Sequence, residues 1–146
     1  MTGDSAGSRP AASGDDRIRA RYVELTGSVP PAIETRLAVA VRTGRLAAVG
    51  AVEALRDELI MANPLGRRTG QLVHYAQLIA LARPGPARLH ARAARLAGAT
   101  FEDLVGVAEL ALITAGMPAY SLGVEIVSEL IAEEGSSGGD DASAAG

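Results

Sequence analysis

The spacing of apolar residues, interrupted by Pro and Gly, is the feature that most restricts the fold of this chain. Apolar residues recur every three or four positions, which is the period of an amphipathic helix. Pro or Gly follows or precedes each such segment, where a helix would end or begin. No segment shows a convincing strand pattern. The sequence therefore predicts an all-α bundle of about seven helices, at about 15–27, 30–44, 45–64, 65–84, 86–96, 101–116 and 118–134.

Local signals mark some of the helix ends. Pro84 is expected to end the fourth helix, and the fifth is expected to run from Pro86 to Leu96. Thr100 is expected to cap the sixth helix, with Asp103 at the third helical position completing a capping box.

Length and composition predict a single domain with an aliphatic core. Apolar residues make up 48% of the 146 residues but aromatic residues only 3%, so the core must consist of Ala, Leu, Val and Ile. Small aliphatic side chains favour closely packed helices. Residues 17–134 are expected to form the helical domain. Residues 1–16 and 135–146 are rich in Gly, Ser, Ala and Asp, so they are expected to be disordered tails.

Several classes of chemistry are excluded by what the sequence lacks. The chain has no cysteine, which rules out disulfides, thiolate metal sites and thiol peroxidase activity. It has no lysine, which rules out Schiff-base catalysis. The net charge of -3 argues against nucleic acid as a partner. Without an apolar run of membrane-spanning length or a secretory signal, we expect no membrane partner and a cytoplasmic location. No metal-ligand spacing is present, so no metal is expected.

Four polar residues are candidates for a site. Arg67, Gln71 and His74 are spaced i, i+4 and i+7, so they share one stripe of the fourth helix. His90, in the stretch "ARPGPARLHARAARLAGAT", lies on the alanine-rich side of the fifth helix, where packing occurs. Histidine is readily tuned to exchange protons near neutral pH, and arginine can hold a carboxylate. This combination suits the chemistry of small acids.

Each candidate also has a simpler structural interpretation. His90 could be a hydrogen-bonded core residue. Arg88, Arg92 and Arg95 could form a solvated face, or pair with acids of a neighbouring helix or subunit. Glu109 is flanked by apolar residues, so it must reach solvent or find a partner. It could orient a histidine or act as a structural anchor.

The run from Asn63 to Leu130 resembles the carboxymuconolactone decarboxylase and alkylhydroperoxidase-D-like superfamily. The resemblance rests on the order of an Asn-Pro-Leu segment with Arg, an apolar helix, a histidine before an Ala-rich segment ending in Gly-Ala-Thr, an acidic pair and a Gly-x-Pro turn. It implies an all-α, alkylhydroperoxidase-D-like fold. It also implies assembly into homo-oligomers.

The superfamily's peroxidase-type members carry a Cys-x-x-Cys pair, a histidine four residues later and an earlier glutamate. On this chain His90 takes the histidine position and Gln71 that of the glutamate. Arg83 and Pro86 stand where the cysteines would be. The resemblance therefore implies a member without cysteines, closer to the decarboxylases than to the peroxidases.

By this analogy, we expect a cofactor-free, non-redox enzyme for a small carboxylated, unsaturated substrate. The reaction would be decarboxylation or a related proton transfer. Arg67 would hold the carboxylate, Gln71 or His74 would stabilise the developing enolate, and His90 would supply the proton. Two alternatives remain: an isomerase, cyclase or lyase of specialised metabolism acting on a more apolar substrate, and a non-catalytic oligomeric scaffold.

The amount of aliphatic sequence also bears on assembly. Stretches such as "RLAVAV" and "GVAELALITAG" contain more apolar surface than seven short helices can readily hide. We therefore expect a homo-oligomer, a trimer or a hexamer, in which the arginine face of the fifth helix pairs with acids of a neighbour.

Overall fold

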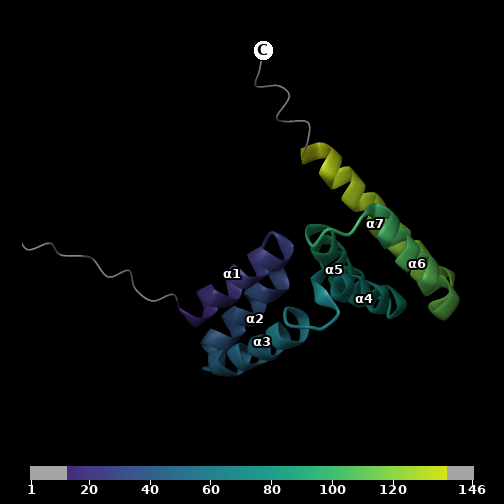
Figure 1. Ribbon diagram of the computed structural model, residues 1–146. Coiled ribbons are helices and arrows are strands. Elements are labelled where there is room, and N and C mark those ends of the chain that lie inside the picture. The colour runs from purple at the N-terminus through teal and green to yellow at the C-terminus, as the bar shows by residue number, and fades with distance from the viewer. Residues whose placement is uncertain (1–12, 138–146) are drawn as a thin grey trace, which may run out of the picture.

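The computed structural model describes residues 13–137, and within this range the chain is folded into helices without a strand. Figure 1 shows their arrangement. The helices are α1 (Gly14–Thr26), α2 (Pro31–Arg42), α3 (Leu46–Ile60), α4 (Gly66–Ala80), α5 (Pro84–Leu96), α6 (Phe101–Ala115) and α7 (Met117–Ser137). The all-α prediction is therefore confirmed. Helical structure extends three residues beyond each predicted domain limit, and Ser13 directly precedes α1. Residues 1–12 and 138–146 of the two expected tails lie outside the described residues.

The helices form an N-terminal group and two hairpins. Helices α1, α2 and α3 pack together, α4 pairs with α5, and α6 pairs with α7. Helix α4 also contacts α6 and α7, and α1 joins the N-terminal group to α5 (Figure 1). The contact between α1 and α5 matters most for the site, because it brings the N-terminal group against the α4–α5 hairpin. None of the described helices is long and apolar enough to cross a membrane.

Two clusters of buried side chains hold these groups together. The larger lies among α4 to α7, and five of its members are alanines on α5 and α6: Ala87, Ala91, Ala94, Ala108 and Ala111. Small side chains let helix axes approach closely, as the composition predicts. The smaller cluster joins α1 and α2 through Ile18, Tyr22, Ile33 and Leu37. Both clusters are mainly aliphatic, with one buried tyrosine in each.

Helices α6 and α7 approach each other closely at Gly123. A Cβ atom added to Gly123 would lie 2.6 Å from Cβ of Ala108, nearer than two such carbons can come. The carbonyl oxygen of Gly123 accepts a hydrogen bond from the Tyr75 hydroxyl at 2.9 Å. Glycine is therefore required here for packing, and Tyr75 ties α4 to the same point of α7.

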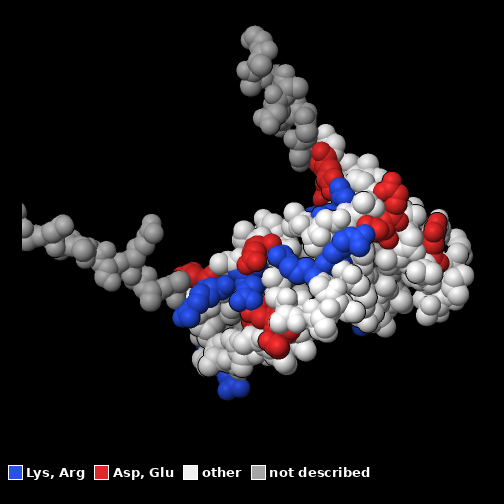
Figure 2. Space-filling view, viewed as in Figure 1, with Lys and Arg blue, Asp and Glu red and all other residues white. Residues whose placement is uncertain are grey.

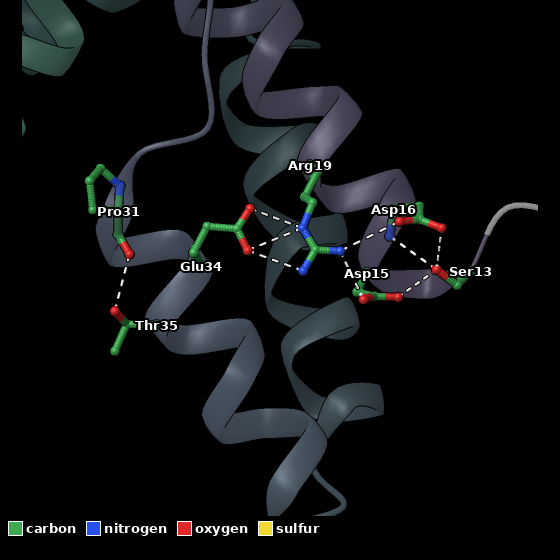
Figure 3. A network of polar contacts seen from close by, with 7 residues as sticks. All are labelled: Ser13, Asp15, Asp16, Arg19, Pro31, Glu34 and Thr35. Atoms are coloured by element: carbon green, nitrogen blue, oxygen red, sulfur yellow. Dashed lines mark hydrogen bonds and ion pairs between the residues drawn. The ribbon is translucent and has the colours of Figure 1, made fainter.

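An ion-pair network fixes α2 to α1, as Figure 3 shows. The Arg19 guanidinium donates from Nε to Oε1 of Glu34 at 2.9 Å and from Nη1 to Oδ2 of Asp15 at 2.9 Å. Ser13 caps α1 by accepting a hydrogen bond from the backbone N–H of Asp16. Arg19 thus connects the first turn of α1 to α2.

The junction of α4 and α5 differs from the prediction. Helix α5 begins at Pro84, so both prolines lie in its first turn instead of Pro84 ending the preceding helix. Proline fits this position because the first helical N–H groups have no intrahelical partner. The chain turns at Ala82, which has a positive φ of 52°.

The capping box predicted for Thr100 and Asp103 at the start of α6 is confirmed, with both reciprocal hydrogen bonds present.

The arginine face of α5 pairs with α7 of the same chain. Figure 2 shows basic and acidic side chains next to each other rather than a patch of one sign. The ion pairs join Arg88 to Glu129 at 2.6 Å, Arg92 to Glu133 at 2.7 Å and Arg95 to Glu134 at 2.7 Å. Of the two partners expected from the sequence, the neighbouring helix is therefore the one observed. Pairing with acids of another subunit stays a prediction, and α7 already supplies acids to these three arginines.

Candidate functional site

The α4–α5 hairpin places His90 against Gln71. Both side chains are buried, with 7% of His90 and 1% of Gln71 exposed. Nδ1 of His90 lies 2.7 Å from Oε1 of Gln71. With the amide oxygen of Gln71 facing it, Nδ1 is the donor and carries the proton. In a neutral ring, Nε2 then carries the lone pair. The polar stripe predicted on the fourth helix thus does reach His90, through Gln71.

His74 lies beside the same ring. The imidazoles of His74 and His90 are stacked, with centroids 4.6 Å apart and an angle of 11° between their planes. Burial lowers the pKa of His90 to about 4, and the nearby His74 and Arg56 add to this effect. Burial and Arg56 also lower the pKa of His74. Both rings are therefore neutral at neutral pH, so the His90 ring has one nitrogen whose lone pair is free to accept a proton.

A cavity of about 500 Å³ lies where the N-terminal group meets α5, and His90 is part of its wall. This volume is in the range of small-molecule sites. Its polar lining is mainly basic, with Arg36 from α2, Arg56 from α3, and Arg88 and Arg92 from α5. The remaining lining residues are Tyr22, Ser28, Pro30, Pro31, Ala32, Ile33, Gly85, Pro86 and Leu89. Such a cavity favours a small anion with an apolar body.

A buried carboxylate, Glu53, organises one side of the cavity. The Tyr22 hydroxyl donates to Oε2 of Glu53 at 3.1 Å, and Nη1 of Arg36 donates to Oε1 at 3.0 Å. Arg56, one turn later on α3, forms a longer ion pair, with Nε 3.5 Å from Oε2 of Glu53. Two guanidinium groups therefore share one carboxylate, which leaves this side of the cavity with net positive charge.

Arg67 is not among the residues that line this cavity. It lies in the first turn of α4, where Nη1 is 3.7 Å from Oε1 of Glu24 on α1. Its Nε atom is buried without a hydrogen-bond partner in the described structure. The carboxylate-binding role expected of Arg67 has no support from the cavity geometry, whereas Arg56 and Arg36 do lie there.

Glu109 points to solvent from α6. Between residues 13 and 137 it makes no hydrogen bond or ion pair, so the expected role of orienting a histidine has no contact behind it. Gln71 occupies that place instead. The same interpretation, an acid flanked by apolar residues, fits Glu53 in "VGAVEALRD" equally well. The pattern of an acid between apolar residues therefore identifies Glu53, which is buried in the structure.

No pattern in the sequence indicates three residues that line the cavity: Tyr22, Arg36 and Arg56. Each is separated from His90 by at least 34 positions, and no local spacing links them to it.

No group of three His, Asp or Glu side chains in the described part of the chain is arranged to hold a metal ion. The arrangement instead offers a neutral imidazole, an amide that orients it and guanidinium groups around one cavity.

A sequence model of the carboxymuconolactone decarboxylase family matches residues 46–129, more than half of the chain. The chain belongs to this family. The region shared with the carboxymuconolactone decarboxylase family starts with α3 and ends within α7, so it contains Glu53, Arg56, Gln71, His74 and His90. Helices α1 and α2, which supply Tyr22 and Arg36, precede the region that matches the family. Searches of curated proteins and of solved structures find no significant match.

Proposed function

We propose that this protein is a cofactor-free, non-redox enzyme that transfers a proton on a small, carboxylated and unsaturated substrate, with decarboxylation as one outcome. The observation that supports this most strongly is the hydrogen bond from Nδ1 of His90 to Gln71, in a ring that is neutral and borders an arginine-lined cavity. Membership of the carboxymuconolactone decarboxylase family fits the same chemistry.

In the proton-transfer reaction, Nε2 of His90 takes a proton from a carbon next to a conjugated carbonyl. The electron pair of the broken C–H bond moves into the conjugated system and gives an enolate. The cavity arginines stabilise the negative charge. Return of the proton from His90 to another carbon of the enolate gives an isomer, so electrons balance without an oxidant.

Decarboxylation uses the same electron sink. The bond between the carbon and its carboxylate breaks, carbon dioxide leaves, and the electron pair forms the enolate. His90, protonated from solvent, then donates its proton to the enolate carbon. A bound anion favours this protonation because opposite charge raises the pKa of an imidazole.

Gln71 and His74 act on His90 in this proposal. Gln71 accepts from Nδ1, which fixes the ring's orientation and leaves Nε2 for the substrate. His74 lies flat against the ring and limits its rotation. Gln71 is therefore a positioning residue, and His90 is the proposed catalytic residue. The four arginines in the lining disfavour the alternative of a more apolar substrate.

Two further expectations remain proposals that rest on the sequence: a cytoplasmic location and assembly into a trimer or hexamer.

Turnover of a panel of small conjugated unsaturated carboxylic acids in D₂O tests this function. NMR would follow deuterium incorporation at carbon, and a coupled assay would follow release of carbon dioxide. We expect at least one acid to react, and His90→Gln to lower its rate by about 10²-fold or more, the usual contribution of an acid/base group.

The matched control for the positioning role compares two glutamines of α4. Gln71→Leu removes the acceptor for Nδ1 and is expected to lower the rate, whereas Gln77→Leu changes an exposed glutamine of the same helix and is expected to leave it unchanged. Circular dichroism would verify that each variant folds. No reaction with any acid, or an undiminished rate in His90→Gln, would favour the non-catalytic scaffold.

A further inference from the structure

Three of the four arginines that line the cavity have strong hydrogen bonds within the protein. Arg36 donates to Glu53 at 3.0 Å, Arg88 to Glu129 at 2.6 Å, and Arg92 to Glu133 at 2.7 Å. Such charge-assisted bonds hold a guanidinium in place and occupy part of its donors. These three arginines therefore help to build the wall.

Arg56 differs from the other three. Across residues 13–137 its guanidinium donates no hydrogen bond, and its contact with Glu53 is an ion pair at 3.5 Å. Its guanidinium carbon lies 5.9 Å from the centre of the Tyr22 ring. A guanidinium has five N–H donors, so Arg56 reaches the cavity with its donors available to a ligand.

Glu53 holds Arg56 without neutralising the site. Its carboxylate also accepts from Tyr22 and Arg36, so two positive charges share one negative charge. About a third of the Arg56 side chain is exposed, and Glu53 is nearly buried. A partly desolvated site with one excess positive charge attracts an anion more strongly than an open surface does.

Arg56 also lies within electrostatic reach of the histidines. Its positive charge contributes to the lowered pKa values of His74 and His90. An anion bound to Arg56 would therefore sit in the same cavity as His90 and within reach of its field. No comparable link connects Arg67 to His90.

We propose that Arg56 binds the carboxylate of the substrate, and that the cavity takes a small unsaturated acid whose reacting carbon then lies against His90. This inference rests on the proposed function of the cavity, since it names the group that anchors the same substrate. Guanidinium and carboxylate can form two parallel hydrogen bonds, which would fix the orientation of the acid. The excess of one positive charge favours an acid with a single carboxylate in this subsite.

Binding of benzoate tests this subsite without any turnover. Benzoate is a planar unsaturated carboxylate, and benzamide has the same shape without the charge. NMR of histidine-labelled protein would follow the His90 ring signals as either compound is added. We expect benzoate to shift these signals and benzamide to bind at least about 10-fold more weakly, since a hydrogen-bonded charged group contributes roughly 1.5–3 kcal/mol.

Variants test whether Arg56 supplies the positive charge that binds benzoate. Arg56→Met is expected to weaken benzoate binding about 10-fold or more and to leave benzamide binding unchanged. Arg56→Lys keeps the charge but lacks the planar fork, so it should bind benzoate with intermediate affinity. Arg67→Met is the matched variant outside the cavity and should bind benzoate as the wild type does. Equal benzoate affinity in wild type and Arg56→Met, loss of binding in Arg67→Met, or equal binding of benzoate and benzamide would overturn the proposal.

The subsite and the proposed function fail in different ways. If Arg56→Met loses benzoate but no acid of the panel reacts with the wild type, the anion subsite stands and the enzymatic function falls. If an acid reacts and Arg56→Met turns it over with unchanged KM and kcat, the function stands and the subsite falls.

Discussion

The imidazole rings of His74 and His90 lie face to face, with centroids 4.6 Å apart. Two rings this close resist carrying charge together, because each positive charge raises the cost of the other. Burial acts in the same direction on both. The pair is therefore neutral over most of the physiological pH range.

This neutral pair predicts that the protein loses stability in weak acid. The pKa of His90 falls from an ordinary 6.5 to about 4 on folding, so the unfolded chain binds the proton more tightly. The free energy of unfolding should therefore fall as the pH drops from about 6.5 to about 4, by about 3 kcal/mol in total for this group. Urea unfolding at pH 7, 6 and 5 measures the slope. His90→Gln should show a shallower slope than the wild type, and identical slopes would refute the assignment.

Gln71→Glu should reverse much of this pKa shift. A carboxylate in place of the amide would accept from Nδ1 and stabilise the imidazolium, which raises the pKa of His90 by about 1–3 units. NMR titration of the His90 ring measures the change. Gln77→Glu adds the same charge to an exposed position of α4 and should have little effect. A His90 pKa that does not move in Gln71→Glu would mean that the two side chains do not interact in solution.

Gly123→Ala should destabilise the packing of α6 on α7. The new methyl group would lie 2.6 Å from Cβ of Ala108, so the helices must separate, at a cost of about 1–3 kcal/mol in unfolding free energy. Gly106→Ala is the control in α6, where no other atom lies within 4 Å of the added Cβ. It should leave stability unchanged or raise it by up to about 1 kcal/mol. Chemical unfolding compares the two variants, and equal effects would contradict this packing.

The exposed face of α6 is the place where we expect a second copy of the chain to bind. Leu110 is 72% exposed and Ile113 is 83% exposed. Beside them, an apolar groove of about 380 Å³ lies between α4 and α6. Light scattering at micromolar concentration should give a multiple of the 14.9 kDa chain mass, and Leu110→Glu with Ile113→Glu should reduce it to one chain. A wild-type mass of one chain would contradict the homo-oligomer.

Much of the helical fold was predictable because its signals are local. The apolar period, the cap at Thr100 and the glycines at helix ends each act within a few residues. The start of α5 was placed wrongly because Pro84 can either follow a helix or occupy its first turn. The sequence does not distinguish these, and here the turn at Ala82 frees Pro84 to begin the helix.

The part of the candidate site on α4 and α5 is predictable from the sequence, whereas the part on α1 and α3 is not. Gln71 and His90 lie on consecutive helices of one hairpin, so their spacing already suggests that they meet. Tyr22 and Glu53 are 31 positions apart, and their hydrogen bond depends on how α1 packs against α3. Helical periodicity identifies which residues share a face but not which helix covers it. Periodicity therefore indicates Arg67, which shares a stripe with Gln71, and carries no signal that Arg56 lies near His90.

The protonation state of the His90 ring at pH 7 tests the central claim most directly. Nitrogen NMR of histidine-labelled wild-type protein distinguishes a protonated ring nitrogen from one with a lone pair. The hydrogen bond to Gln71 predicts a neutral ring with the proton on Nδ1 and the lone pair on Nε2. A ring protonated on Nε2, or on both nitrogens, would leave no base in the cavity and would contradict the proposed chemistry.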